Sequence, residues 1–286
     1  MFPPALLTGF PESRFQQRAH PTGSEGGYMA LQEMVPPAKA AAVIPAALPA
    51  RTDRGGKAVA NAVLLSVPDE EFLLLRPFLE PVPLPRYQIL YEQSGRIDFA
   101  YFLNEGMISL VIITSDGRSV EVGICGRQDV IGGALIFEVN YSSMRAIVQL
   151  PGSGLRISSD ILSENIGRCP TLRRTTERLL LTQQLQVAQL AACNRLHEVD
   201  QRLARWLLMC QDTVDDIRLP LTHEFIAQML GTGRPSVTIA AGVLERAGLI
   251  ENTRGAVQIT NRKRLEDAAC ECYGAIQNLR SGLVLQ

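Results

Sequence analysis

The sequence is poor in histidine, has no long hydrophobic run and carries none of the familiar catalytic motifs. Its three histidines, in 286 residues, lie in unrelated contexts and supply no catalytic triad. A glycine-rich nucleotide-binding loop is also missing. No apolar segment reaches the roughly 20 residues of a membrane-spanning helix, and the first residues lack the pattern of a secretory signal. We therefore expect a cytoplasmic, non-enzymatic protein with no catalytic residue and no membrane partner.

The cysteines include no C-x-x-C pair, a spacing typical of metal and redox motifs. They are Cys125, Cys169, Cys193, Cys210, Cys270 and Cys272. One residue separates Cys270 from Cys272, which leaves two interpretations: a redox or metal pair, or structural thiols. Few histidines accompany the pair, and a helix would point the two side chains apart. We therefore interpret all six as reduced structural thiols and predict no metal site.

Charge is unevenly distributed along a chain whose formal net charge is only −1. Residues 61–160 contain seven Lys and Arg against twelve Asp and Glu, a net of −5, whereas residues 218–286 contain eight against six, a net of +2. Because DNA phosphates attract cationic surfaces, the C-terminal part is the better candidate for a nucleic-acid interface.

The first two segments differ sharply in composition. Residues 1–60 are rich in proline, glycine and alanine without apolar periodicity, which predicts a flexible extension. In residues 61–168, Pro68 and the acids after it start a short helix. Short β-like runs then follow between turn residues, at 88–91, 99–103, 107–114, 119–125, 130–132, 145–150 and 154–157. Many short strands at close spacing predict a small antiparallel sandwich or barrel.

Residues 169–197 have the pattern of one long helix, without internal glycine or proline after Pro170. Four residues follow one another at heptad spacing: Leu172, Leu179, Gln186 and Cys193. One interpretation packs this face on the helix's own domain, and the other places it in a two-stranded dimer interface. We adopt the dimer interface, because one isolated sandwich offers little surface to cover so long a helix.

The last segment, residues 198–286, contains the pattern of two helices joined by a tight turn. Thr222 suits the N-cap of the first helix, and Gly231 suits a left-handed turn after it. Pro235 suits the first turn of the second helix. The exposed N-terminal end of this second helix then carries Arg234, Ser236 and Thr238, where side chains reach a major groove.

A hairpin signal follows at Arg254 and Gly255, between two short extended runs. It predicts a wing, with Arg254 at its tip against the DNA backbone. Helix pairs with such small-residue spacing also occur in proteins that never bind DNA, but here the turn, the exposed arginine and the wing occur together. We therefore predict that Thr222, Arg234, Ser236, Thr238 and Arg254 contact double-stranded DNA.

From residue 64 to 273 the arrangement resembles the Crp/Fnr family. The resemblance rests first on the helix-turn-helix, at Leu221, Thr222, Glu224, Ala227, Gly231, Arg234, Val237, Leu244 and 248–250, and then on 101–103, Gly106 and 123–132. It implies an α+β fold made of a β-roll sensor domain (61–168), a dimerisation helix (169–197) and a winged helix-turn-helix domain (198–286). It also implies a homodimer on a two-fold-symmetric operator, an unidentified small-molecule effector and RNA polymerase as a further partner.

The expected effector pocket departs from the family pattern. It would comprise Gly132, Gly133, Ala134, Leu135, Ser143 and Arg145. Gly133 stands where cyclic-nucleotide-binding members have a ribose-binding Glu, and the phosphate-binding Arg position falls near Ser143 or Met144. Arg145 is close by, but a strand residue displaced by one position points to the other face. We therefore expect an effector other than a cyclic nucleotide.

The sequence also lacks the residues that bind the other cofactors of this family. No cysteine precedes Cys125, so the N-terminal iron–sulfur cluster of the oxygen-sensing branch is not expected. His20, His197 and His223 are a poor supply of axial ligands for a haem. We predict no cofactor.

The second helix of the motif also differs from the family pattern of Arg-Glu-Thr-Val with a later Arg. Here Arg234 is followed by Pro235, Ser236 and Val237, and Ile239 stands at the later Arg position. Arg234 keeps a role on guanine or phosphate, but the operator sequence is expected to differ. The alternative function is a ligand-binding or scaffolding module whose C-terminal helices bind protein rather than DNA.

Overall fold

The computed structural model describes residues 51–284. Most of the predicted flexible extension, residues 1–50, lies outside this range. Residues 51–60, which we assigned to the extension, are instead folded onto the sensor domain. The Arg51 guanidinium is buried, donates to the carbonyls of Leu64 and Val67, and pairs with Asp69 at 2.7 Å. The sensor domain therefore begins earlier than predicted.

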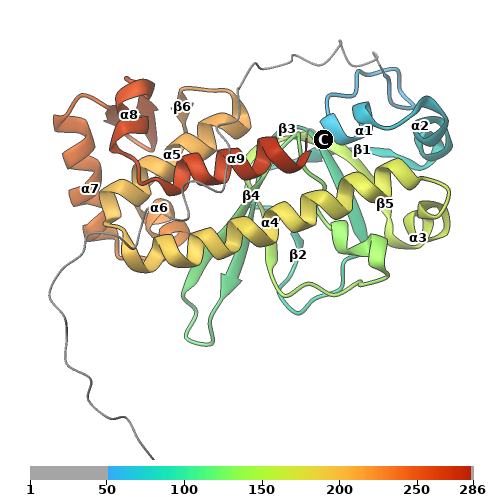
Figure 1. Cartoon of the computed structure of the whole chain (residues 1–286), viewed down its shortest axis with the longest axis horizontal. Coiled ribbons are helices and arrows are strands. Elements are labelled where there is room, and N and C mark those ends of the chain that lie inside the picture. The colour runs from blue at the N-terminus through green and yellow to red at the C-terminus, as the bar shows by residue number, and fades with distance from the viewer. Residues whose placement is uncertain (1–50, 285–286) are drawn as a thin grey trace, which may run out of the picture. The chain divides into compact units, whose positions relative to one another are not determined.

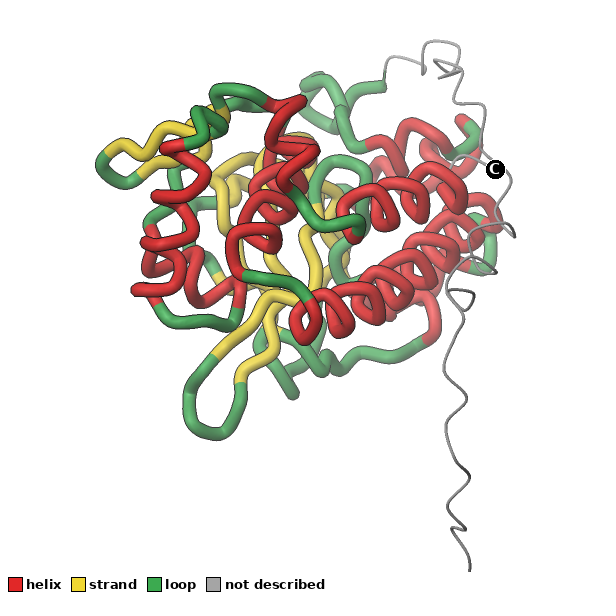
Figure 2. Tube along the Cα trace, turned by 60° about the vertical axis from the view of Figure 1, so that its left-hand side comes forward, coloured by secondary structure: helices red, strands yellow, loops and turns green. Residues whose placement is uncertain are grey.

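The sensor domain consists of short helices around one antiparallel sheet, with strand order β1-β5-β3-β4 and β2 paired to β5. Its helices and 3₁₀ turns are α1 (Ala62–Ser66), α2 (Asp69–Leu75), η1 (Arg76–Phe78), η2 (Gly133–Phe137) and α3 (Ser159–Ile166). Its strands are β1 (Glu80–Leu84), β2 (Ile89–Tyr91), β3 (Phe99–Ile113), β4 (Ser119–Cys125) and β5 (Arg145–Ser158). Figure 1 shows these elements in blue to green, and Figure 2 distinguishes strands from helices by colour.

Two of these strands are longer than the sequence predicted. The turn signals near Gly106 and Gly152 lie inside β3 and β5, where the pairing shifts register instead of ending. Gly106 has φ 92°, and a Cβ there would lie 2.9 Å from the Leu150 carbonyl oxygen. These glycines therefore permit a bulge in a continuous strand pair. The sequence did not predict β1, because Pro81 and Pro83 are unusual in a strand. This strand lies at the edge of the sheet, where proline is tolerated.

The long helix α4 (Pro170–Leu196) confirms the predicted helix, but its buried face corrects the predicted dimer interface. The four heptad residues Leu172, Leu179, Gln186 and Cys193 are all buried within one chain. Leu172 and Leu179 join the sensor core. The C-terminal helix α9 (Cys272–Val284) runs beside α4 and covers more of this face (Figure 1). The sequence pattern does not show that α9 packs on this face. The four side chains are therefore too buried to contact a partner chain.

The DNA-binding half is built around α5 (Val199–Val214), whose apolar face includes the fully buried Trp206 and Leu207. The elements that follow are β6 (Arg218–Leu219), α6 (His223–Leu230), α7 (Arg234–Arg246), β7 (Ile250–Thr253), β8 (Ala256–Ile259) and α8 (Arg262–Ala268). The three strands form an antiparallel sheet in the order β6-β8-β7. The α+β architecture predicted from the sequence is confirmed.

Within residues 51–284, no helix combines the length and the apolar character needed to cross a bilayer.

Candidate nucleic-acid interface and sensor cavity

The turn between α6 and α7 is built by local interactions that the sequence predicted. The Thr222 hydroxyl accepts a hydrogen bond from the Phe225 backbone N–H at 3.2 Å, which caps α6. Gly231 ends α6 with φ 60°, the left-handed conformation that favours glycine. Ala227 is buried where the two helices cross. These interactions hold the two helices in a helix-turn-helix arrangement.

The N-terminal end of α7 is exposed. Gly233 is its N-cap and Pro235 lies in its first turn. Arg234 and Thr238 are exposed and Ser236 is half-buried, so the three predicted residues lie on the accessible end of the helix. Ile239 beside them has a relative exposure of 69%, an unusual position for a large apolar side chain. The positive end of the α7 helix dipole also favours phosphate here.

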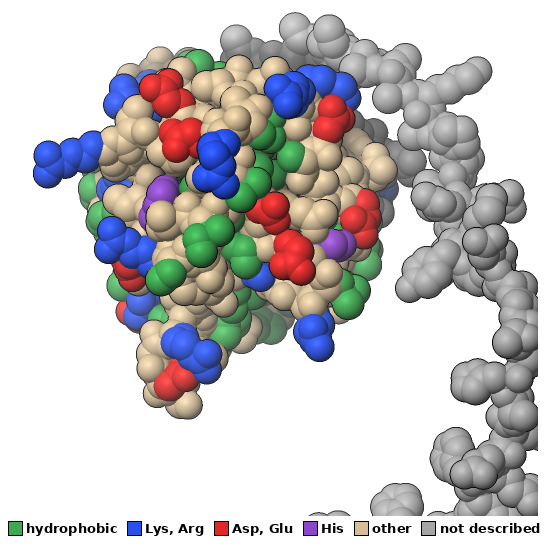
Figure 3. Space-filling view, turned by 90° about the vertical axis from the view of Figure 1, so that its left-hand side faces the viewer, with side chains coloured by type: hydrophobic (Ala, Val, Ile, Leu, Met, Phe, Trp, Pro, Cys, Tyr) green, Lys and Arg blue, Asp and Glu red, His purple; other side chains and the backbone are tan. Residues whose placement is uncertain are grey.

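The wing lies next to α7, as predicted. β7 and β8 form its two strands, and the exposed Arg254 with Gly255, at φ 78°, makes the turn between them. Figure 3 shows this end of the molecule, with Lys and Arg side chains projecting among hydrophobic ones. The structure thus brings Thr222, Arg234, Ser236, Thr238 and Arg254 into one helix-turn-helix and wing unit.

His223 connects these elements, a role that the sequence did not reveal. Its Nδ1 lies 3.2 Å from the Thr238 hydroxyl on α7, and its Nε2 lies 3.2 Å from Asn252 Oδ1 on β7. The Asn252 backbone N–H in turn donates to the Glu245 carboxylate of α7 at 2.8 Å, which lowers the pKa of Glu245. His223 therefore orients a predicted DNA contact, Thr238, relative to the wing. Its only sequence signal was its position in the first turn of α6.

The sensor domain contains a cavity of about 240 Å³ between the sheet and α4. Of the six predicted pocket residues, Gly132, Gly133, Ala134 and Ser143 line it. Leu135 does not: it is buried in the sensor core. Arg145 does not line it either, because its guanidinium pairs with Glu92 at 2.7 Å. These two assignments are corrected.

The cavity wall, within the described residues, contains no Lys, Arg, Asp or Glu side chain. Its polar groups are hydroxyls, a thiol and an amide, from Tyr91, Tyr141, Ser142, Ser143, Cys125 and Gln183. Gln183 of α4 donates to the Cys125 sulfur at 3.2 Å, and this contact joins the helix to β4. Burial raises the pKa of Tyr91, which keeps its hydroxyl neutral. The wall offers hydrogen bonds but no charge partner for an anion.

Helix α4 packs against Gly133, the position where cyclic-nucleotide-binding members have a Glu. A Cβ added to Gly133 would lie 3.0 Å from the Thr176 methyl carbon and 3.4 Å from Leu180 Cδ2. A side chain at residue 133 would therefore require the Thr176 and Leu180 side chains of α4 to shift. The glycine is explained by the close approach of α4.

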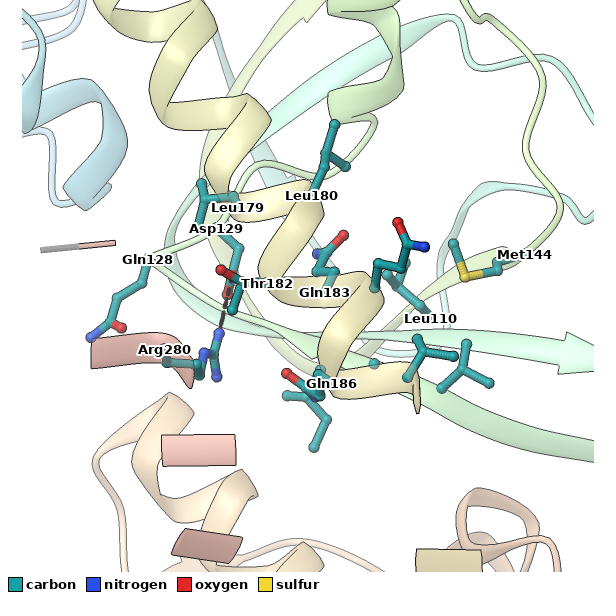
Figure 4. Close-up of a pocket in the computed structure, with 15 residues that line it drawn as sticks. Leu110, Gln128, Asp129, Met144, Leu179, Leu180, Thr182, Gln183, Gln186 and Arg280 are labelled. Carbon is teal, nitrogen blue, oxygen red and sulfur yellow. Dashed lines mark hydrogen bonds and ion pairs between the residues drawn. The ribbon is translucent and has the colours of Figure 1, made fainter. Parts of the chain in front are cut away.

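A second cavity, of about 190 Å³, lies further along α4 (Figure 4). Figure 4 shows Arg280 of α9 reaching across it to Asp129 of the sensor domain. Two hydrogen bonds of 2.8 and 3.0 Å join this pair. The Asp129 charge raises the pKa of Arg280. The two charges neutralise each other, so this cavity also presents no free cation.

The sheet and the DNA-binding half are joined by a buried carboxyl group. Glu121 of β4 accepts hydrogen bonds from the Trp206 indole N–H of α5 at 2.7 Å and from the Ser109 hydroxyl at 2.6 Å. Burial raises the pKa of Glu121 to about 7, although both hydrogen bonds act in the opposite direction. The group whose pKa is raised toward neutrality thus lies at the contact between the two halves.

Two family models match this chain. The model of the cyclic nucleotide-binding domain matches residues 81–166, and that of the Crp-like helix-turn-helix domain matches residues 201–268. The fold and these two domains define a winged helix-turn-helix regulator with a cyclic-nucleotide-binding-like sensor domain. The two matched domains together place the chain in the Crp/Fnr family of transcription regulators.

Known proteins of this family resemble the chain along most of their length. The CRP-like cAMP-activated global transcriptional regulator of Mycobacterium tuberculosis is 24% identical over 194 residues, which are 65% of this chain and 87% of that protein. The structure of FixK2 from Bradyrhizobium japonicum matches with a TM-score of 0.58 and 16% identity, over 67% of this chain and 98% of that one. The c-di-GMP responsive global regulator CLP of Xanthomonas campestris matches with a TM-score of 0.55 and 15% identity, over 67% and 99%.

Proposed function

We propose that this regulator acts as a homodimer on a two-fold-symmetric operator, and that α7 and the wing contact the DNA. The supporting observation is the exposed N-terminal end of α7, where Arg234 lies beside a wing that carries Arg254. A guanidinium in a major groove makes two hydrogen bonds to guanine or clamps a phosphate. Ile239 stands where the family pattern has a second Arg, so the operator differs from the familiar one.

Selection of fragments from a random DNA pool tests this proposal. We expect the purified protein to enrich a palindromic sequence and Arg234→Ala to bind it more weakly by about 1–3 kcal/mol. Arg246→Ala is the matched control, since it removes the same charge at the other end of α7 and should retain the sequence preference. If neither the protein nor the control enriches any sequence, with or without added cell extract, the scaffolding alternative is favoured, with Ile239 and Val243 as its exposed apolar residues.

The dimer is proposed to use the exposed face of α4. Leu181, Leu185 and Ala188 are exposed there at spacings of four and three residues, the pattern of a helix-pair interface. We expect Leu181→Glu with Leu185→Glu to convert a dimer to a monomer in sedimentation experiments and to abolish binding to a palindromic site. Leu73→Glu, which alters an exposed leucine of α2, is the control. A dimer that survives the double substitution would place the interface elsewhere.

The effector is proposed to be a small molecule without a phosphate group. Two of the relatives named above respond to cAMP or to c-di-GMP, both anions, whereas the cavity of this chain has no cationic side chain among its described residues. A neutral ligand fits the hydroxyl, thiol and amide groups of the wall better. RNA polymerase, the further partner that the resemblance implies, stays a prediction.

A further inference from the structure

Three cysteines and a histidine converge at the hinge between the long helix and the DNA-binding half. Cys193 and His197 lie four residues apart, on one face of the last turn of α4. Cys270 and Cys272 lie in the segment where α9 begins. The ligand atoms of the four side chains all lie within 4.8 Å of one another. We propose that these four residues bind one zinc ion that fixes the hinge between α4 and α5, a site that goes beyond the proposed DNA-binding function.

This convergence was not expected from the sequence, where a helix was predicted to point Cys270 and Cys272 apart. Cys270 and Glu271 instead precede α9, so the chain bends at this point and both thiols face the same side. Cys193 Sγ lies 3.5 Å from Cys270 Sγ, and Cys272 Sγ lies 3.6 Å from His197 Nδ1. The cysteines are buried and the imidazole is mostly buried.

The separations fit a single tetrahedral ion. With Zn–S near 2.3 Å and Zn–N near 2.0 Å, the ligand atoms of a tetrahedral site lie roughly 3.5–3.8 Å apart. An iron–sulfur cluster contains several iron atoms and holds its cysteine sulfurs further apart. Three thiolates and one imidazole form a soft donor set, which suits zinc, and four protein ligands form the closed type of site that is structural.

The surrounding groups support each ligand in turn. His197 Nε2 lies 3.1 Å from the Glu271 carboxylate, which orients the ring so that Nδ1 faces the thiols. The Gln189 amide donates to the Cys272 sulfur at 3.0 Å, a hydrogen bond that stabilises a thiolate.

The buried charge of Arg205 provides an independent argument for a zinc ion at this site. Arg205 has a relative exposure of only 3%, and its Nε has no hydrogen-bond partner among the described residues. Its Nη1 contacts only the Met209 sulfur, at 3.2 Å. A zinc ion with three thiolates and a neutral imidazole carries a net charge of −1, which would compensate this buried guanidinium.

The position of the site gives the ion a mechanical role. His197 is the C-cap of α4 and Glu198 is the N-cap of α5, so the hinge directly follows two of the ligands. The other two ligands follow α8 and belong to the DNA-binding half. An ion held by both pairs would cross-link α4 to that half and restrict the angle at the hinge.

Metal analysis of the reduced full-length protein tests this proposal. After removal of metal with a chelator, readdition of zinc and desalting, we expect one tightly held zinc ion per chain. Cys193→Ser and Cys272→Ser should lose it, whereas Cys169→Ser, which alters a buried cysteine at the other end of α4, should retain it. Cobalt should give the intense visible absorption of a tetrahedral thiolate site in the wild type and in Cys169→Ser alone.

Two further measurements on the wild type test the zinc site even if a variant fails to fold. In the wild type, zinc should protect three thiols from a thiol reagent and raise the unfolding temperature. If the folded, reduced wild type retains no zinc, or if zinc protects no thiol, the proposal is wrong. A Cys193–Cys270 disulfide in air-oxidised protein, together with no metal uptake after reduction, would assign the cluster to redox chemistry instead. Because metal content is measured without DNA, failure of this site would leave the DNA-binding proposal untouched.

Discussion

The DNA-reading face and the sensor cavity of this regulator differ in how far their chemistry follows the family pattern. The face keeps an exposed cation at the first turn of α7 and another at the wing tip. The cavity, by contrast, shows no cation on its described wall, and Gly133, at the position of the family's Glu, packs tightly against Thr176 and Leu180 of α4. The architecture of both regions is retained. The difference teaches that the polar residues of one domain can depart from the family pattern while the other domain keeps part of its own.

The sensor sheet and the DNA-binding half meet at Glu121, where the largest effect is expected. Since its pKa is raised to about 7 in the folded state, the folded protein binds more protons than the unfolded chain between about pH 4.5 and 7. The stability contributed by Glu121 is therefore present below this window and is lost as the pH rises through it. From the size of the shift, the loss is roughly 3 kcal/mol.

Glu121→Gln should remove this pH dependence. The free energy of unfolding of Glu121→Gln minus that of the wild type, measured with urea, should rise between pH 4.5 and 8, because only the wild type loses stability there. Glu105→Gln, an exposed carboxyl on the neighbouring strand, is the control. Parallel stability curves for Glu121→Gln and wild type would show that Glu121 ionises normally in the folded protein.

A cation added to the cavity wall should give the cavity, like the DNA-reading face, a group that binds phosphate. Ser143→Arg adds a guanidinium to the wall, and we expect it to bind cyclic nucleotides more tightly than wild type by about 1.5–3 kcal/mol, the range of a hydrogen bond to a charged group. Ser143→Gln, of similar length but neutral, should gain far less. Calorimetric titration measures both. Tight binding of cAMP by the unmodified protein would contradict our view of the cavity.

The smallest effect is expected at the wing. Arg254→Ala should weaken binding to all DNA sequences about equally, because a phosphate contact carries no base information. The slope of log affinity against log salt should fall by about 1. Fluorescence anisotropy at several salt concentrations, on the selected site and on random DNA, distinguishes this from Arg234→Ala. A loss confined to the selected site would instead show that Arg254 reads bases.

Much of the DNA-binding half was predictable because its signals are local. Thr222, Gly231 and Pro235 act on the backbone within a few residues of themselves, through a cap, a left-handed turn and a fixed φ. The hairpin at Arg254 and Gly255 is equally local. By contrast, His223 was overlooked, since its two partners lie 15 and 29 residues further along the chain.

The sensor half shows where local signals mislead. Gly106 and Gly152 were interpreted as ends of strands, because glycine breaks strands in isolation. In the sheet, the long pairing of β3 with β5 continues through them. The heptad residues of α4 were interpreted as a dimer interface, but α9 and the chain's own core bury them instead.

The amino-acid sequence by itself determined the family and the helix-turn-helix and wing that carry the predicted DNA contacts, because each depends on short-range patterns. Tertiary structure alone decided which face of α4 is covered, how close the helix lies to Gly133, and which distant groups meet. Glu121 and Trp206 are 85 residues apart in sequence, and Cys193 and Cys270 are 77 apart. Such contacts depend on the packing of whole elements, so no local propensity or spacing encodes them.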